Sequence, residues 1–164
     1  MTYRVCFVCT GNICRSPMAE SVFRARVAES GLEGRVGVDS AGTGGWHEGE
    51  GADPRTMAVL ERNGYGLDHT ARQFQVEWFS RLDLVIALDA GHLRALRRMA
   101  PTEQDAAKVR LLRSYDPAVS GGDLDVPDPY YGGADGFEEC LEMVVAASQG
   151  LLAEVREQVE GRAA

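Results

Sequence analysis

Residues 3–17 read YRVCFVCTGNICRSP and carry the clearest structural pattern in the chain. Its first part, residues 3–8, is a short apolar run of the kind found in buried strands, and Cys9 begins a turn that contains a glycine. Pro17 suits the first turn of a helix. The apolar residues around and after it recur at helical spacing, and they are Met18, Ala19, Val22, Phe23 and Val27. The stretch therefore predicts a strand, a loop and a helix in direct succession.

The rest of the chain repeats this alternation. Further strands are predicted at residues 36–41, 82–88 and 109–112, and helices at residues 54–63, 90–99 and 137–159. One apolar stripe is expected along the last helix, made of Phe137, Leu141, Val144, Val145, Leu152, Val155 and Val159. This order favours an α/β fold with a parallel sheet and helices on both faces.

Length and composition favour a single domain over residues 1–164. Hydrophobic residues make up 45% of the chain and charged residues 26%, which is ordinary for a protein with one packed core. The formal net charge of −8 disfavours nucleic acids and anionic membranes as partners. A site for any anionic ligand would therefore have to be locally positive.

The sequence also bears on location. It begins without an apolar signal region, and its apolar runs stay well below the roughly 20 residues of a spanning helix. Its four cysteines are then expected to be reduced thiols rather than a disulfide framework. We expect a soluble cytoplasmic protein, with export by a route that needs no signal peptide left open.

Two long loops are candidates for the walls of a site. Residues 42–53 and 114–136 are rich in glycine or proline, and loops of this length are usually functional or mobile. Ligands of open parallel sheets bind at the carboxyl ends of the strands, and residues 9–14 follow such an end.

Cys9 and Arg15 stand at the two ends of the first loop, with five residues between them. A loop of this length before a helix can turn its backbone N–H groups inward and form a nest for three phosphate oxygens. Arg15 adds a planar fork that can bond two of these oxygens. The helix N-terminus and Arg15 both favour a thiolate at Cys9, which is a nucleophile toward phosphorus.

A plainer interpretation treats Cys9 and Cys14 as small buried hydrophobic residues and Gly11 as a turn residue. For a lone cysteine that interpretation would be preferred. Here a thiol, a glycine, an arginine and a hydroxyl occur in order between a strand and a helix, which favours the phosphate site.

Four segments of the chain resemble one protein family. They are residues 8–17 (VCTGNICRSP), 39–43 (DSAGT), 69–73 (HTARQ) and 128–132 (DPYYG). The resemblance is to the low-molecular-weight protein tyrosine phosphatases, and specifically to a bacterial member. It implies a single-domain, three-layer fold with a four-stranded parallel sheet, similar to flavodoxin and Rossmann folds. It also implies hydrolysis of phosphotyrosine in proteins, and of small aryl phosphates, through a phosphocysteine intermediate. Neither a cofactor nor a metal is expected, and phosphate and vanadate-type anions are expected to inhibit.

The resemblance assigns three catalytic roles. Cys9 is the nucleophile, Arg15 clamps the phosphate, and Asp128 is the general acid and then the base for the attacking water. Composition alone would make Asp128 one of several solvated loop aspartates. Because Pro129 keeps the preceding backbone extended and out of any helix, the Asp128 carboxyl group can lean over a pocket.

The resemblance also assigns supporting residues. The phosphate-binding loop comprises Thr10, Gly11, Asn12, Ile13, Cys14 and Ser16, and the Ser16 hydroxyl hydrogen-bonds the thiolate. Asn12, Ser40 and His69 form a network that holds the loop in shape. The residues alone also favour a structural role for His69 over that of a catalytic base.

Cys14 has two interpretations that stay open. Its sulfur could capture an oxidised Cys9 as a disulfide before irreversible oxidation, because the two cysteines are five residues apart in a tight loop. Alternatively, Cys14 is a thiol packed beneath the loop. Cys6 and Cys140 are expected in the core.

Three aromatic residues are candidate walls of a substrate slot. Trp46 lies in one long loop, and Tyr130 and Tyr131 lie in the other, in regions that the family uses for this purpose. A phenyl ring between aromatic faces gains about 0.5–1.5 kcal/mol per pair beyond burial. The alternative is that all three are ordinary surface residues.

Several rival functions conflict with particular residues. Arsenate reductases resemble this family but need a redox cysteine pair in mid-chain, and no cysteine lies between Cys14 and Cys140. Protein-arginine phosphatases of this fold carry threonine where this chain has Ile13, which is better suited to a phenyl ring. A phosphopeptide-binding module or a dithiol redox protein is a different class, and pure binding needs neither Cys9 as nucleophile nor Asp128 as proton donor.

Overall fold

The computed structural model describes residues 2–119 and 122–163. Residues 1, 120, 121 and 164 lie outside the described residues, so the predicted loop at 114–136 and the predicted domain over 1–164 are each described in part. Within the described ranges, no helix is both long and apolar enough to cross a membrane.

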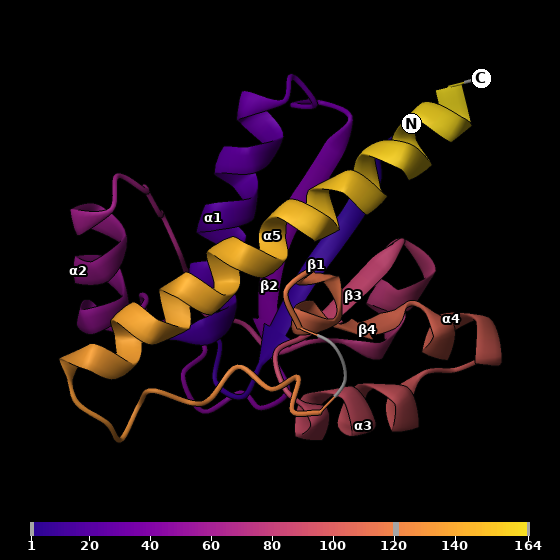
Figure 1. The fold of residues 1–164 in the computed structure, drawn as a ribbon. Helices are drawn as coiled ribbons and strands as arrows, with labels where there is room; N and C mark the ends of the chain where they lie inside the picture. Colours follow the sequence, from indigo (N-terminus) through magenta and orange to yellow (C-terminus); the bar gives the residue numbers. More distant parts are fainter. Residues whose placement is uncertain (1, 120–121, 164) are drawn as a thin grey trace.

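Four parallel strands form one sheet in the order β2-β1-β3-β4, which confirms the predicted four-stranded parallel sheet (Figure 1). The strands are β1 (Tyr3–Cys9), β2 (Val36–Gly42), β3 (Leu84–Ala87) and β4 (Val109–Leu111). Cys9 pairs with Gly42 and Val8 pairs with Ala87, so these carboxyl ends meet at one edge. Because the strand order changes direction between β1 and β3, the segment after β1 lies where open α/β sheets bind ligands.

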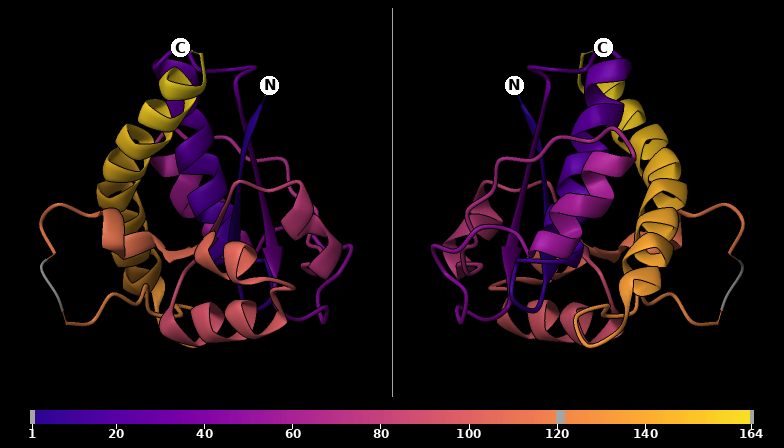
Figure 2. Two further views of the ribbon diagram at one scale, coloured as in Figure 1. Left: turned by 90° about the vertical axis from the view of Figure 1, so that its right-hand side faces the viewer. Right: turned by 90° about the vertical axis from the view of Figure 1, so that its left-hand side faces the viewer.

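Helices cover both faces of the sheet. They are α1 (Arg15–Glu29), α2 (Pro54–Arg62), α3 (Ala90–Met99), α4 (Glu103–Ala107) and α5 (Ala134–Ala163). Helices α1, α2 and α5 pack together on one face, whereas α3 and the 3-10 helix η1 (Val76–Ser80) cover the other (Figure 2). A second 3-10 helix, η2 (Leu112–Tyr115), contacts α5. The predicted three-layer α/β fold is confirmed.

Strand β1 supplies both cores because its side chains alternate between the two faces of the sheet. Val5, Phe7 and Cys9 belong to the core beneath α1 and α5, and Cys6 and Val8 belong to the core on the opposite face. All five are at most 3% exposed. The predicted burial of this strand, and of Cys6, is confirmed.

Helix α5 is longer than predicted and buries a slightly different stripe. It spans Ala134–Ala163 instead of residues 137–159. Val145 and Leu152, which the sequence places in the stripe, are only half-buried, and Ala147 and Leu151 take the inward positions. The reason is geometric: residues 147 and 151 continue the inward row by steps of three and four, whereas 145 and 152 fall in the next row. The other five predicted members and Cys140 are buried.

The remaining differences lie at element ends and in short elements. Strand β3 begins at residue 84 instead of 82, and η2 and α5 shorten the predicted 114–136 loop at both ends. Helix α4 has five residues and none of them is buried, so the apolar pattern gives no sign of it. Its capping signal is nevertheless present, because Thr102 Oγ1 accepts a hydrogen bond from Asp105 N at 3.0 Å.

Candidate active site

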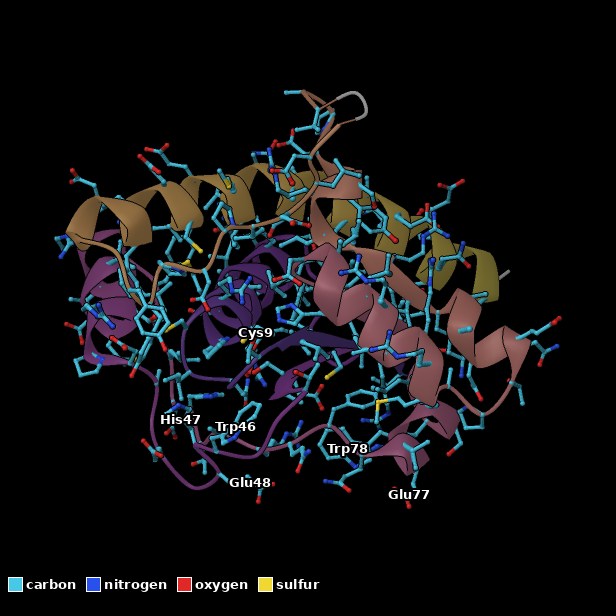
Figure 3. All side chains as sticks on the ribbon, turned by 90° about the horizontal axis from the view of Figure 1, so that it is seen from below. Cys9, Trp46, His47, Glu48, Glu77 and Trp78 are labelled. Carbon is cyan, nitrogen blue, oxygen red and sulfur yellow. The ribbon has the colours of Figure 1, made fainter. Side chains whose placement is uncertain are left out.

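The loop between β1 and α1 forms the floor of the candidate site. Cys9 ends β1 and Arg15 begins α1, so the predicted loop spans residues 10–14. Asn12 has φ 59°, in the left-handed region that asparagine adopts more readily than most residues. Figure 3 looks at this edge of the sheet and shows Trp46 and His47 in a neighbouring loop on the same side as Cys9.

Cys9 lies beneath the loop with its sulfur against a hydroxyl group. It is 3% exposed, and its Sγ lies 3.0 Å from Ser16 Oγ. Ser16 accepts a hydrogen bond from Asn12 Nδ2 at 2.8 Å, so its own hydrogen is available to the sulfur or to Ala41 O at 3.3 Å. A hydroxyl that donates to the sulfur stabilises negative charge there.

Asn12 is the centre of the predicted supporting network. Its Nδ2 donates to Ser40 Oγ at 3.0 Å as well as to Ser16. His69 Nε2 donates to the Asn12 carbonyl oxygen at 2.6 Å, because a carbonyl can only accept. These contacts bring together Asn12, Ser40 and His69 as expected, and they lie behind the loop rather than in the cavity.

Arg15 is a buried cation held from two sides. Its Nη1 donates to Asp89 Oδ2 at 2.8 Å and to Val126 O at 2.9 Å, which uses both Nη1 hydrogens. The edge with Nε and Nη2 is then the one that can form a bidentate contact with a phosphate group. Burial lowers the pKa of Arg15, but the neighbouring Cys9, Asp89 and Asp128 outweigh it, so the pKa lies above its ordinary value.

Asp128 leans over this floor from the loop before α5. Its Oδ2 lies 3.6 Å from Arg15 Nη2, and its side chain is 44% exposed. Its Oδ1 accepts a hydrogen bond from Tyr130 N at 3.0 Å, which orients the carboxylate. The carboxyl group therefore lies between solvent and the guanidinium group, within reach of a leaving group at the rim.

A cavity of about 260 Å³ joins these elements. Its lining contains the predicted nucleophile, clamp, acid and aromatic residues and four of the six predicted loop residues, together with His47, which was not predicted: Cys9, Thr10, Gly11, Ile13, Cys14, Arg15, Trp46, His47, Asp128, Tyr130 and Tyr131. The loop residues Asn12 and Ser16 do not line it. Trp46 and Tyr131 are 73% and 93% exposed, so both present most of their surface to solvent at the rim. The Tyr130 ring packs edge-on against Tyr131, with centroids 5.0 Å apart, and the Arg55 guanidinium lies 5.3 Å from its centroid.

Cys14 is buried beside Cys9 and lines the same cavity. Burial raises its pKa to about 12, and the nearby Asp53 and Cys9 add to the effect. All four cysteines are free thiols in this structure. The structure thus has Cys14 packed beneath the loop, and it leaves a later disulfide with Cys9 as a prediction.

Several residues of the site are missing from the sequence-based prediction. Asp89 holds Arg15, Glu20 accepts a hydrogen bond from Ser40 Oγ at 2.6 Å, and Arg72 N donates to Asn12 Oδ1 at 3.0 Å. Asp89 could have been predicted from the sequence, because it is a polar residue at the carboxyl end of the buried strand beside β1, where such sheets bind ligands. Glu20 had no such signal, since its contact depends on how distant segments pack, and Arg72 had only its place in the family-like segment 69–73.

His47 and His92 were also not predicted as site residues from the sequence. The His47 ring packs against Gly11, where an added Cβ atom would lie 2.9 Å from its Cδ2 atom. His92 Nε2 lies 2.8 Å from Thr10 Oγ1. The sequence indicated His47 only through its position next to Trp46, a predicted wall residue.

Comparisons with known proteins agree with this arrangement. The family described as "Low molecular weight phosphotyrosine protein phosphatase" matches residues 4–161. A protein of Streptomyces coelicolor named "Low molecular weight protein-tyrosine-phosphatase" is 85% identical over 164 residues, covering all of both chains.

Solved structures have the same fold. The crystal structure of YfkJ from Bacillus subtilis is 39% identical, has a TM-score of 0.89, and is matched over 96% of this chain and 97% of its own. A Drosophila arginine phosphatase is 31% identical with a TM-score of 0.84, over 92% of this chain and 96% of its own. Sequence and structure together give one conclusion: the chain is a bacterial member of the low molecular weight phosphotyrosine protein phosphatase family.

Proposed function

We propose that the chain is a protein tyrosine phosphatase that hydrolyses phosphotyrosine in proteins through a phosphocysteine intermediate. The observation that carries this proposal is the convergence of Cys9, Arg15 and Asp128 on one aromatic-walled cavity. Family membership supports it, since relatives bear the names of tyrosine phosphatases. Small aryl phosphates are expected as further substrates.

In the first step, the phosphate group lies in the loop, where backbone N–H groups and the Nε–Nη2 edge of Arg15 bond its oxygens. The Cys9 thiolate attacks phosphorus, forming the P–S bond as the P–O bond to the phenol breaks. Asp128, protonated at this stage, gives its proton to the departing phenolate oxygen. The products are the phosphocysteine and a neutral phenol.

In the second step, the same carboxyl group acts as a base. Asp128 takes a proton from a water molecule, whose oxygen attacks phosphorus while the P–S bond breaks. Cys9 leaves as a thiolate, and the 3.0 Å contact with Ser16 supports that charge. Free phosphate departs, and Asp128 is again protonated for the next cycle.

The walls of the cavity favour an aryl ester. A ring entering between Trp46 and the two tyrosines contacts aromatic faces on its way to the floor. The single methylene of phosphoserine would leave its phosphate short of the Cys9 sulfur. Inorganic phosphate and vanadate match the loop without needing the walls, so we expect both to inhibit.

A kinetic panel of matched peptides tests the substrate assignment. Phosphotyrosine should exceed phosphoserine and phosphothreonine in kcat/KM by at least about a hundredfold. Trp46→Ala should erode that lead more than it lowers the rate with p-nitrophenyl phosphate, because the small substrate needs less of the wall. Equal rates across the panel would refute the assignment.

An arginine phosphatase is the second candidate, because a solved arginine phosphatase shares this fold. Ile13 argues against it, since an isoleucine side chain offers no hydroxyl to a guanidinium group and lines the cavity as an apolar surface. Phosphoarginine peptides belong in the same panel. Faster turnover of phosphoarginine than of phosphotyrosine would replace our proposal with this one.

We further propose that Cys14 protects Cys9 during oxidation. Hydrogen peroxide would convert the Cys9 thiolate to a sulfenic acid, and the Cys14 thiol would then form an S–S bond with it as water is released. The support is that both sulfurs line one cavity. Peroxide inactivation should be reversed by dithiothreitol in the wild type and become largely irreversible in Cys14→Ser. Failure to find a Cys9–Cys14 disulfide by mass spectrometry after mild peroxide would exclude this role.

We also propose that residues 1–164 act as one phosphatase domain in the cytoplasm. The sheet and the two cores built on β1 support the single domain. The four free cysteines support a reducing compartment.

A further inference from the structure

His92 is a buried histidine that the mechanism above does not use. It lies in the first turn of α3, is 5% exposed, and directs its ring at the phosphate-binding loop. Its Nε2 lies 2.8 Å from the Oγ1 atom of Thr10, the residue next to the nucleophile. Its backbone N–H donates to Asp89 Oδ1 at 2.9 Å, which caps the helix. One imidazole ring thus joins the loop to the start of α3.

The surroundings of the ring select one tautomer. Burial lowers the pKa of His92 to about 4 against the opposing effect of Asp89, so the ring is neutral near neutral pH. Its Nδ1 lies 3.2 Å from Asp89 Oδ1, too poorly aligned for a full hydrogen bond. A lone pair on Nδ1 would be repelled by this carboxylate, whereas an N–H is attracted. The proton therefore belongs on Nδ1, and Nε2 accepts a hydrogen bond from the Thr10 hydroxyl.

This tautomer has a consequence for Arg15. Because the Thr10 hydroxyl donates its hydrogen to His92, its oxygen lone pairs are free to face Arg15. Arg15 Nη2 lies 3.5 Å from Thr10 Oγ1 and can donate to it. Arg15 Nη1 donates to Asp89, which in turn holds His92. The four residues close a ring of contacts, in which Asp89 is joined to His92 through the His92 backbone N–H, and this ring restrains both Nη atoms of the guanidinium group. The edge that can bond phosphate oxygens is restrained with them.

We propose that His92 is a positioning residue: it holds the Thr10 hydroxyl and, through Thr10 and Asp89, sets the plane of the Arg15 fork. This inference rests on the proposed role of Arg15 as the phosphate clamp. It assigns a role to the side chain of Thr10, which the proposed mechanism above does not use.

Kinetics of four variants test the proposal. They are His92→Leu, Thr10→Val, the two combined, and His92→Gln, whose amide oxygen can accept near the position of Nε2. Each of the first two should lower kcat/KM for p-nitrophenyl phosphate about tenfold, which corresponds to about 1.4 kcal/mol. The double variant should lose no more than either single one, because both remove the same contact. His92→Gln should stay within about threefold of the wild type.

Two binding and spectroscopic readouts separate positioning from mere stability. The Kd of orthovanadate, measured by calorimetry, should rise about tenfold in His92→Leu and in Thr10→Val, because Arg15 holds the bound anion without turnover. In protein whose histidines are labelled with nitrogen-15, NMR should show that the His92 ring is protonated at Nδ1 and unprotonated at Nε2. Thr10→Val should shift the Nε2 signal of His92 and leave that of His47 in place.

Ser148→Ala is the matched control. It removes a buried hydrogen bond of 2.7 Å to Val144 O inside α5, away from the residues that line the cavity. It should leave kcat/KM and the vanadate Kd unchanged even if the protein is less stable. Additive losses in the double variant, or a wild-type vanadate Kd in His92→Leu, would overturn the inference. An inactive wild type that binds no vanadate would instead overturn the proposed function.

Discussion

The Arg15 side chain is charged although it is only 3% exposed, so its hydrogen-bond and ion-pair partners must offset the free energy of burying that charge. Its oxygen partners include Asp89, the Val126 carbonyl group and Asp128, in addition to Thr10 Oγ1. Removing one partner of a buried charge typically costs about 3–5 kcal/mol. Because the first three partners follow β3 and precede α5, the contacts that stabilise the charge also hold the loop of Asp128, the proposed general acid, near Cys9, the proposed nucleophile.

Asp128→Asn tests the proton donor. The amide cannot protonate a leaving group, so kcat/KM should fall most for esters of unsubstituted phenol and least for p-nitrophenyl phosphate, whose phenolate leaves readily. The measurement is a leaving-group series at fixed pH. An equal loss across the series would show that Asp128 is not the donor.

His92 should make the stability of the fold depend on pH. Its pKa falls from 6.5 to about 4 on folding, with Asp89, Arg15, Asp128 and Asp125 around it. Between these two values the unfolded chain binds one more proton than the folded one, so the free energy of unfolding decreases as pH falls through this window. A tenfold change in proton affinity is worth about 1.4 kcal/mol, so the total effect is on the order of 3 kcal/mol.

Denaturant titrations at pH 6.5 and pH 4 measure this effect, with His92→Gln as the reference. The wild type should lose more stability than the variant over that range, by on the order of 3 kcal/mol. Parallel losses in the two proteins would mean that the folded state does not hold this ring neutral.

At the scale of elements, the segment that carries Asp128 is fastened to the β3–α3 junction. Asp125 Oδ1 accepts a hydrogen bond from Ala90 N at 2.8 Å, and Val126 N donates to Leu88 O at 2.8 Å. The segment is therefore held at the carboxyl end of β3, next to the loop that follows β1. This attachment explains how an exposed loop aspartate comes within 3.6 Å of Arg15.

Gly150→Ala should weaken the contact between α5 and η2. A Cβ atom there would lie 1.8 Å from the Tyr115 carbonyl oxygen, so the backbone of one element must move. Overpacking of this kind costs roughly 1–3 kcal/mol, and we expect about 2 kcal/mol or more by chemical denaturation. Gly161→Ala is the matched control in the same helix, since nothing lies within 4 Å of its added Cβ. It should be neutral or stabilising by up to about 1 kcal/mol, and equal effects in the two variants would contradict this packing.

Elements with a clear hydrophobic period could be predicted from the sequence, and the others could not. Strand β1 was predicted from a short apolar run and is buried along nearly its whole length, and helix α1 was predicted from apolar residues at helical spacing, which are buried together with their neighbours in residues 15–23. Helix α5 buries a regular row of side chains. Helix α4 buries none, and η1 is a five-residue 3-10 helix that buries one residue, Phe79. The inward row of α5 was misplaced at Val145 and Leu152 because apolar residues on two adjacent rows cannot be ranked without knowing the neighbour.

At the scale of the whole molecule, the chain carries a net charge of −8, so the proposed phosphate site must depend on local positive charge, which Arg15 supplies. The carboxyl ends of β1 and β3 bring together the loop of Cys9 and Asp89, and hydrogen bonds to the β3–α3 junction add the segment of Asp128. Cys9 and Arg15 were predictable because they stand at the two ends of one short loop, and the spacing of a thiol and a guanidinium group around such a loop is visible in the sequence. The His92–Thr10 contact was not, since it joins residues 82 positions apart and depends on which side of α3 faces the sheet.

The most direct test of the account is to trap the phosphocysteine. Asp128→Asn lacks the base for the second step, so with p-nitrophenyl phosphate it should accumulate the intermediate. After rapid denaturation and digestion, mass spectrometry should find one added phosphoryl group, located by fragmentation at Cys9 and not at Cys14. Cys9→Ala, treated in parallel, should carry none. Release of p-nitrophenol without any covalent adduct, or a phosphoryl group on another residue, would contradict the account.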